Sequence, residues 1–134
     1  MSTPTEPAGR VEHVLLVDDE EGLSFLLKRI LGKQGYQVTS YTDPVTALED
    51  FRSRPDAFDV VVTDLSMPGM SGIDLASRIL ERRPSLPLVM ISGDFRSEDI
   101  ESAHRAGIKH LVLKPNTIDE LGTLLHRLLA GACA

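Results

Sequence analysis

Hydrophobic and polar positions follow one pattern along this chain, in which a short apolar run precedes a longer amphipathic segment. The pattern occurs five times, and the apolar runs lie at residues 11–17, 36–41, 59–63, 88–91 and 110–113. Within the longer segments, apolar residues recur at spacings of three and four, which is typical of helices with one buried face. Strands and helices that alternate through short loops predict an α/β fold, a doubly wound five-stranded parallel sheet with helices on both faces.

Local signals refine this prediction. The run at 59–63 is rich in β-branched residues and suits a central strand buried on both faces, whereas the run at 36–41 alternates and suits an edge strand. Residues typical of helix N-caps precede four of the helical segments. They are Asp43 before Pro44, Ser71, Ser97, and a capping box formed by Thr117 and Glu120.

The composition describes one soluble domain with an acidic surface. The 134 residues carry a formal net charge of −6, and such a surface repels phosphate backbones, so we expect no direct contact with nucleic acid. The single cysteine, Cys133, cannot form an internal disulfide, and no apolar run has the ~20 residues needed to cross a bilayer. We therefore expect a cytoplasmic protein with a flexible leader at 1–10, one domain at 11–130 and a tail at 131–134.

Polar side chains follow four of the five predicted strands. Asp18 and Asp19 come directly after the first strand, Asp64 after the third, Ser92 after the fourth and Lys114 after the fifth. The carboxyl ends of parallel strands meet at one edge of a doubly wound sheet, where ligands bind. The sequence thus predicts that three carboxylates, a hydroxyl and an ammonium group lie close together, although they are almost a hundred positions apart.

Three adjacent carboxylates raise one another's pKa unless a cation neutralises them. Oxygen ligands without nearby His or Cys favour a hard ion, and the small number of protein ligands favours Mg²⁺. A carboxylate held between such an ion and a lysine can attack phosphorus and form an aspartyl-phosphate. On this interpretation Asp64 is the nucleophile, while Lys114 stabilises charge on the phosphoryl oxygens and Ser92 donates a hydrogen bond to them. Glu20 and Glu21, which follow the acidic pair, suit the positive end of the first helix dipole.

These motifs resemble those of the receiver domain of bacterial two-component response regulators, over about residues 11–130. The matching segments are Leu-Leu-Val-Asp18-Asp19-Glu, Val-Val-Thr-Asp64-Leu-Ser-Met-Pro-Gly-Met-Ser-Gly, Met-Ile-Ser92-Gly and Leu-Val-Leu-Lys114-Pro115. The resemblance implies a CheY-like, flavodoxin-like (βα)5 fold with strand order 2-1-3-4-5. It also implies that Asp64 accepts a phosphoryl group from a histidine kinase.

The resemblance assigns roles to the other residues of the set. Asp19, Asp64 and the backbone carbonyl of Ser66 would coordinate Mg²⁺, and Asp18 would act through water. Ser92 would be the switch hydroxyl and Lys114 the phosphoryl contact, followed by a cis Lys114–Pro115 peptide. Ser66 and Asp94 would flank the phosphoryl group and tune its lifetime.

One position departs from the family pattern. Receiver domains usually carry Tyr or Phe three residues before the lysine, and this chain has Leu111 there. His110 is adjacent but should point to the opposite face of the sheet, because side chains alternate along a strand. We therefore expect the signal to leave the site through loop movement or side-chain packing rather than through an aromatic rotamer.

The resemblance also implies partners. A histidine kinase or phosphotransfer protein would be the donor, and a downstream protein or effector domain would receive the signal. The domain would assist its own phosphorylation and dephosphorylation without being an enzyme for a separate substrate. The sequence leaves open whether the chain is a segment of a longer protein, and whether apolar residues on its last two helices form a homodimer.

Three other functions use similar groups or the same topology. A phosphohydrolase of the haloacid dehalogenase type also combines Asp, Ser or Thr, Lys and Mg²⁺, but it has an Asp-x-Asp pattern where this chain has Asp18-Asp19. A receiver that works as an interaction module without phosphorylation is a second alternative, against which the intact Asp64 and Lys114 argue. A flavin site is disfavoured because no Gly-rich phosphate loop follows the first strand.

Overall fold

The computed structural model describes residues 11–114 and 117–133; of residues 117–119 and 131–133 it describes only the backbone. Several predictions therefore lie outside the described part. They are the leader at 1–10, the cis Lys114–Pro115 peptide and the side chain of Thr117 in the predicted capping box. The predicted tail at 131–134 is described only in part, and the backbone of 131–133 continues the last helix, which runs from Thr117 to Cys133.

Five parallel strands form one sheet in the order β2-β1-β3-β4-β5, as the resemblance implies. The strands are β1 (His13–Val17), β2 (Gln37–Tyr41), β3 (Val60–Asp64), β4 (Leu88–Ser92) and β5 (His110–Leu113). Every residue of β1, β3 and β4 is buried, whereas β2 lies at the edge and keeps most of its residues at least partly exposed. The central and edge positions predicted from the sequence are thus confirmed.

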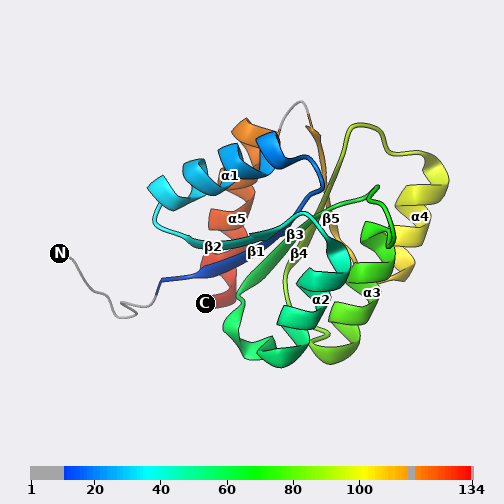
Figure 1. Ribbon diagram of the computed structural model, residues 1–134, viewed down its shortest axis with the longest axis horizontal. Coiled ribbons are helices and arrows are strands. Elements are labelled where there is room, and N and C mark those ends of the chain that lie inside the picture. Colours follow the sequence, from blue (N-terminus) through cyan, green and yellow to red (C-terminus); the bar gives the residue numbers. More distant parts are fainter. Residues whose placement is uncertain (1–10, 115–116, 134) are drawn as a thin grey trace.

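Helices cover both faces of the sheet (Figure 1). They are α1 (Glu21–Lys33), α2 (Pro44–Ser53), α3 (Gly72–Arg82), α4 (Ser97–Arg105) and α5 (Thr117–Cys133), with a 3₁₀ turn at Pro55–Ala57. Apolar side chains of α1 and α5 pack on one face, and those of α2, α3 and α4 pack on the other. Strand β3 serves both layers, because Val60 and Val62 face α1 and α5 while Val61 faces the opposite helices.

Two of the predicted caps are confirmed and one is wrong. The Asp43 carboxylate accepts hydrogen bonds from the backbone of Val45 and Thr46, and the Ser71 hydroxyl accepts one from Asp74. Helix α4, however, begins after Arg96, so Ser97 is its first helical residue rather than its cap. The reason lies one turn on, where the Asp99 carboxylate accepts the Arg96 N–H at 3.0 Å and fixes the start of the helix.

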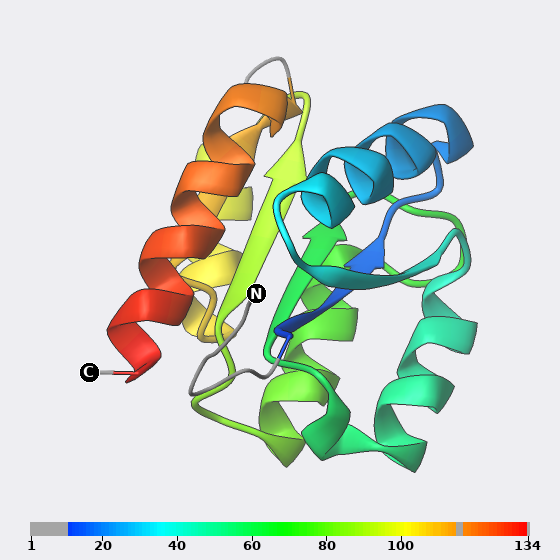
Figure 2. The same ribbon diagram turned by 90° about the vertical axis from the view of Figure 1, so that its left-hand side faces the viewer.

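All neighbouring strands are parallel and therefore run toward the same edge of the sheet, and the arrowheads of β3 (green) and β4 (yellow-green) in Figure 2 point to it. The residues that follow those ends therefore share one crevice, which is the part of the fold that concerns function. Among the described residues, no helix combines the length and the hydrophobicity needed to cross a membrane.

Candidate functional site

Asp64 is the last residue of β3 and is buried at the carboxyl edge of the sheet. The backbone on either side of its turn is firmly held. The Leu65 N–H donates to the Ile91 carbonyl of β4 at 2.9 Å, and the Gly72 N–H donates to the Leu65 carbonyl at 2.8 Å. These bonds tie Asp64 to the neighbouring strand and to the start of α3 at once.

Gly72 allows α3 to approach Asp64 closely. A Cβ atom at position 72 would lie 2.1 Å from the Asp64 carbonyl oxygen and 3.0 Å from the Leu65 Cα. Both are backbone atoms, which cannot turn aside as the tip of a side chain can. The absence of a side chain at Gly72 is therefore what allows this helix to begin directly behind the Asp64 backbone.

Asp18 provides a second carboxylate, from the end of β1. It is fully buried, and its backbone N–H donates to the Tyr41 carbonyl at 3.1 Å. Its Oδ1 atom accepts the Glu20 N–H at 2.9 Å, which folds the chain back over the strand end. Its Oδ2 atom is buried and has no hydrogen-bond partner among the described residues. An orphaned carboxylate oxygen of this kind fits a site that receives a cation.

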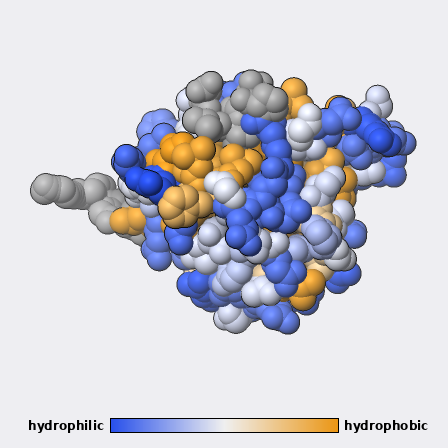
Figure 3. Space-filling model, turned by 45° about the horizontal axis from the view of Figure 1, so that its top comes forward, coloured by the Kyte–Doolittle hydropathy of each residue, from blue (hydrophilic) through white to orange (hydrophobic). Residues whose placement is uncertain are grey.

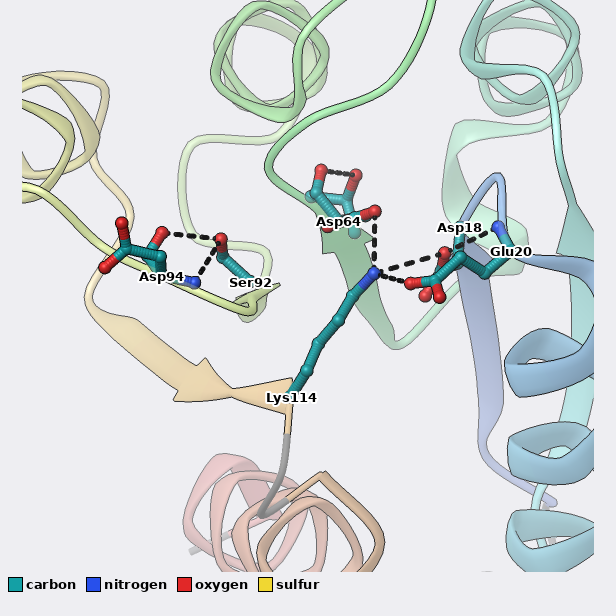
Figure 4. A network of polar contacts seen from close by, with 7 residues as sticks. Asp18, Glu20, Asp64, Ser92, Asp94 and Lys114 are labelled. Atoms are coloured by element: carbon teal, nitrogen blue, oxygen red, sulfur yellow. Dashed lines mark hydrogen bonds and ion pairs between the residues drawn. The ribbon is translucent and has the colours of Figure 1, made fainter.

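Lys114 joins the acidic residues from the other side of the crevice. Its Nζ atom donates to Asp64 Oδ2 at 3.1 Å, lies 3.8 Å from Asp18 Oδ1, and also forms an ion pair with Glu20. Figure 4 shows its side chain reaching from the end of β5 to a point between Asp64 and Glu20. The predicted meeting of Asp18, Asp64 and Lys114 is thus present in the fold.

The buried charges shift one another's protonation. Burial raises the pKa of Asp18 to about 6, and the nearby Asp64 adds to this effect. Burial also raises the pKa of Asp64, although the hydrogen bond from Lys114 lowers it and the neighbouring Asp19 carboxyl raises it again. Burial alone would lower the pKa of Lys114, but its bonds to Glu20 and Asp64 prevail and raise it. The crevice therefore disfavours the charged forms of Asp18 and Asp64 even beside Lys114, which fits a site that receives a further cation.

Oxygen atoms of Asp18, Glu20 and Asp64 all lie within 4.8 Å of one another and could together hold a metal ion. The set consists only of oxygen donors, which suits a hard ion. Of the three carboxylates predicted for the metal, Asp18 and Asp64 belong to this group, and Glu20 stands in place of Asp19. Asp19 is exposed and lies outside this group, although its carboxyl is near enough to raise the pKa of Asp64.

Glu20 is thus the functional candidate that sequence reasoning missed. Its position beside Asp18 and Asp19 is visible in the sequence, but the sequence pattern assigns it only to the positive end of the α1 dipole. The contact with Lys114 joins positions 94 residues apart and appears only in the fold.

Ser92 lies at the same edge but its hydroxyl is engaged elsewhere. It donates to the Asp94 carbonyl at 2.7 Å and accepts the Asp94 N–H at 3.2 Å. In the described part of the chain it makes no hydrogen bond to Asp64 or Lys114, and Figure 4 shows it turned toward Asp94. Ser66 and Asp94, the predicted flanking residues, both line a cavity of about 650 Å³ next to it.

The side chains of β5 alternate as expected. Leu111 packs on the cluster formed with α2, α3 and α4, and Phe95 from the β4–α4 loop packs on the same cluster. His110 faces the opposite layer, where it lines a cavity with Thr123 and Arg127 of α5. Position 111 therefore has no aromatic ring, and Phe95 adds one to the same apolar cluster.

A family model described as the response regulator receiver domain matches residues 14–126. The chain belongs to this family. Chemotaxis protein CheY of Pseudomonas aeruginosa is 38% identical to it over 111 residues, which cover 81% of this chain and 88% of that protein. A solved receiver domain from Clostridium thermocellum, 24% identical, matches with a TM-score of 0.84 over 91% of this chain and 97% of that one, which supports the fold.

Receiver domains also form part of longer proteins. Two-component response regulator ARR14 of Arabidopsis thaliana is 32% identical over 90% of this chain, but the match covers 31% of that protein. Sensor protein EvgS of Escherichia coli is 33% identical over 86% of this chain, and the match covers 9% of its length. The chain thus spans less than a third of these relatives.

Proposed function

We propose that this receiver domain is a phosphoacceptor switch in which Asp64 takes a phosphoryl group from a histidine kinase or phosphotransfer protein. The observation that carries the proposal is the contact between Lys114 Nζ and Asp64 Oδ2 at 3.1 Å, beside the buried Asp18. A lysine bonded to a buried carboxylate at a strand end places positive charge where phosphoryl oxygens would gather.

The proposed transfer forms one bond and breaks another. A deprotonated oxygen of Asp64 bonds to phosphorus as the phosphorus–nitrogen bond of the donor phosphohistidine breaks. The departing imidazole nitrogen keeps the bonding electron pair and takes up a proton from solvent. Lys114 favours the charged form of Asp64 that this step requires, because its hydrogen bond and charge lower the pKa that burial raises.

Mg²⁺ is the proposed cofactor. The orphaned oxygen of Asp18 and the oxygen-only surroundings support a hard divalent ion at this place. We keep Asp19, Asp64 and the Ser66 carbonyl as its proposed ligands, with Asp18 acting through water. The effect of the Asp19 carboxyl on the pKa of Asp64 supports this set, because it requires the two carboxyls to be near each other. When bound, the ion would supply positive charge to phosphoryl oxygens.

The switch would then act through the β4–α4 loop. Ser92 is the proposed switch hydroxyl, and to reach a phosphoryl group it would exchange its bonds with the Asp94 backbone for a new one. The loop continues into Phe95, which packs on the same apolar cluster as Leu111. This supports transmission by loop movement and packing where position 111 lacks an aromatic ring.

A donor protein needs a surface near the crevice, and α1 offers one. Its first turn follows Glu20 directly, and Phe25 and Leu26 are 64% and 41% exposed. The Arg29 guanidinium lies 5.9 Å from the centre of the Phe25 ring. Figure 3 shows hydrophobic side chains gathered among hydrophilic ones on the face viewed from above. We propose that the phosphodonor docks over α1. The receiver of the signal would be a separate cytoplasmic protein or an effector domain.

The test uses a small phosphodonor, acetyl phosphate, and intact-protein mass spectrometry. With Mg²⁺ the wild type should gain one phosphoryl group, and Asp64→Asn should gain none. Asp74→Asn is the matched control, because Asp74 is an exposed carboxylate in the first turn of α3 and should leave labelling unchanged. Equal labelling of Asp64→Asn and wild type would refute the proposal, as would turnover of a generic phosphate ester.

A further inference from the structure

Glu20 and Lys114 form a contact that spans the mouth of the crevice. Lys114 Nζ pairs with Glu20 Oε1 on one side and with Asp64 Oδ2 on the other. The three side chains differ in exposure, which is 56% for Glu20, 20% for Lys114 and 5% for Asp64. The ammonium thus lies between an outer carboxylate at the rim and an inner carboxylate at the floor.

The backbone of Glu20 is fixed in a way that aims its side chain at this rim. Its N–H donates to Asp18 Oδ1 at 2.9 Å, and its carbonyl accepts the Ser24 N–H at 3.0 Å in the first turn of α1. Glu20 is the N-cap residue of that helix, so its position is set by both the strand end and the helix start. The Glu20 side chain therefore starts from a defined place beside Asp18.

An ammonium group can donate three hydrogen bonds, and here Lys114 donates to Glu20 and Asp64 and lies 3.8 Å from Asp18 Oδ1. A phosphoryl group on Asp64 would require bonds from the same ammonium. Asp18 and Asp64 lie inside the crevice with the incoming group, whereas Glu20 draws the ammonium outward. The outer carboxylate and the phosphoryl oxygens would then compete for one cation.

We propose that Glu20 is a positioning residue that tethers Lys114 at the rim and competes with the phosphoryl group on Asp64 for its ammonium. This inference rests on the proposed phosphoacceptor function. On this proposal Lys114 must leave Glu20 before it can bind the phosphoryl group. A stronger ion pair between Glu20 and Lys114 would therefore make the phosphorylated form less favourable.

Glu20→Gln tests the tether, because it keeps the shape and the backbone bonds of residue 20 while it removes the charge. Glu21→Gln is the matched control. It removes the same charge one residue away, on an exposed side chain that makes no contact with Lys114 among the described residues. Any effect of net charge or of the α1 dipole should appear in both variants.

The first measurement is the rate at which an acylating reagent modifies Lys114 in the metal-free protein, followed by peptide mass spectrometry. Glu20→Gln should raise that rate roughly two- to fivefold, the range of a partly exposed ion pair, while Glu21→Gln should not. This measurement does not involve phosphorylation. An unchanged Lys114 rate in Glu20→Gln would overturn the tether.

The second measurement is the affinity for beryllofluoride, a phosphoryl mimic, at saturating Mg²⁺. Glu20→Gln should bind it roughly two- to fivefold more tightly than wild type, and Glu21→Gln should match wild type. An unchanged or weaker affinity of Glu20→Gln would overturn the competition. Failure of the wild type itself to bind beryllofluoride would instead refute the proposed function, and the Lys114 rate would still decide the tether.

Discussion

The tight approach of α3 to Asp64 predicts that Gly72→Ala is strongly destabilising. The new Cβ would lie 2.1 Å from the Asp64 carbonyl oxygen, whereas ordinary van der Waals contact begins at 3.4 Å. Either the helix or the strand end must therefore move by about 1.3 Å. Such a movement would strain the bond between the Gly72 N–H and the Leu65 carbonyl, and it would displace Asp64 itself.

Overpacking of this kind typically costs about 1–3 kcal/mol, and contact with backbone atoms places this site at the upper end. We therefore expect Gly72→Ala to lose roughly 3 kcal/mol of unfolding free energy. With a urea dependence of about 2 kcal/mol per molar, the midpoint of urea unfolding should fall by about 1.5 M.

The control is the same substitution in another helix. Gly32 lies in α1, is exposed, and would meet no atom within 4 Å if it carried a Cβ. Because glycine is about 0.5–1 kcal/mol less favourable than alanine in a helix, Gly32→Ala should raise the midpoint slightly. A Gly72→Ala protein as stable as wild type would refute the close approach, whatever Gly32→Ala does.

Further predictions concern the carboxylates. The hydrogen bond from Arg54 lowers the pKa of Asp50 from 3.8 to about 2, so Asp50 should stabilise the fold above pH 4 and lose this effect toward pH 2. Asp50→Asn should flatten that part of the stability curve in acid titrations followed by circular dichroism; an unaltered curve would contradict the pairing. Burial raises the pKa of Asp18 to about 6, so protonated Asp18 favours the folded state below about pH 4. This contribution to stability is lost as the pH rises through 6. Asp18→Asn should therefore raise the melting temperature of the metal-free protein at pH 7, measured by calorimetry. A lower melting temperature would contradict the idea that the buried, charged Asp18 destabilises the fold.

The sheet could be predicted because its signals are local and repeated. Each strand is a compact apolar run, and the burial of β3 on both faces follows from its three consecutive valines. The convergence of Asp18, Asp64 and Lys114 could be predicted too, because topology alone brings strand ends together. The orientation of His110 away from Leu111 followed from strand alternation.

Other features depended on competition among nearby groups, which no pattern resolves. Ser92 could donate to several acceptors, and the Asp94 backbone is the one its hydroxyl meets. Ser97 lost its predicted capping role because Asp99 reaches back to the Arg96 N–H. The pairing of Glu20 with Lys114 requires the chain to turn back over Asp18, and the hydrogen bond from the Glu20 N–H to the Asp18 carboxylate holds that turn. In each case the sequence shows which polar side chain is present, but it does not show which group that side chain bonds to.

The central claim is that Asp64 is the residue that carries the phosphoryl group. The most direct test is to phosphorylate the protein with acetyl phosphate and Mg²⁺, reduce the acyl phosphate with borohydride, and locate the reduced residue by peptide mass spectrometry. The account predicts that the modification lies at position 64 and is absent without the phosphodonor. A modification at Asp18, Asp19 or Glu20 with Asp64 unchanged would contradict it.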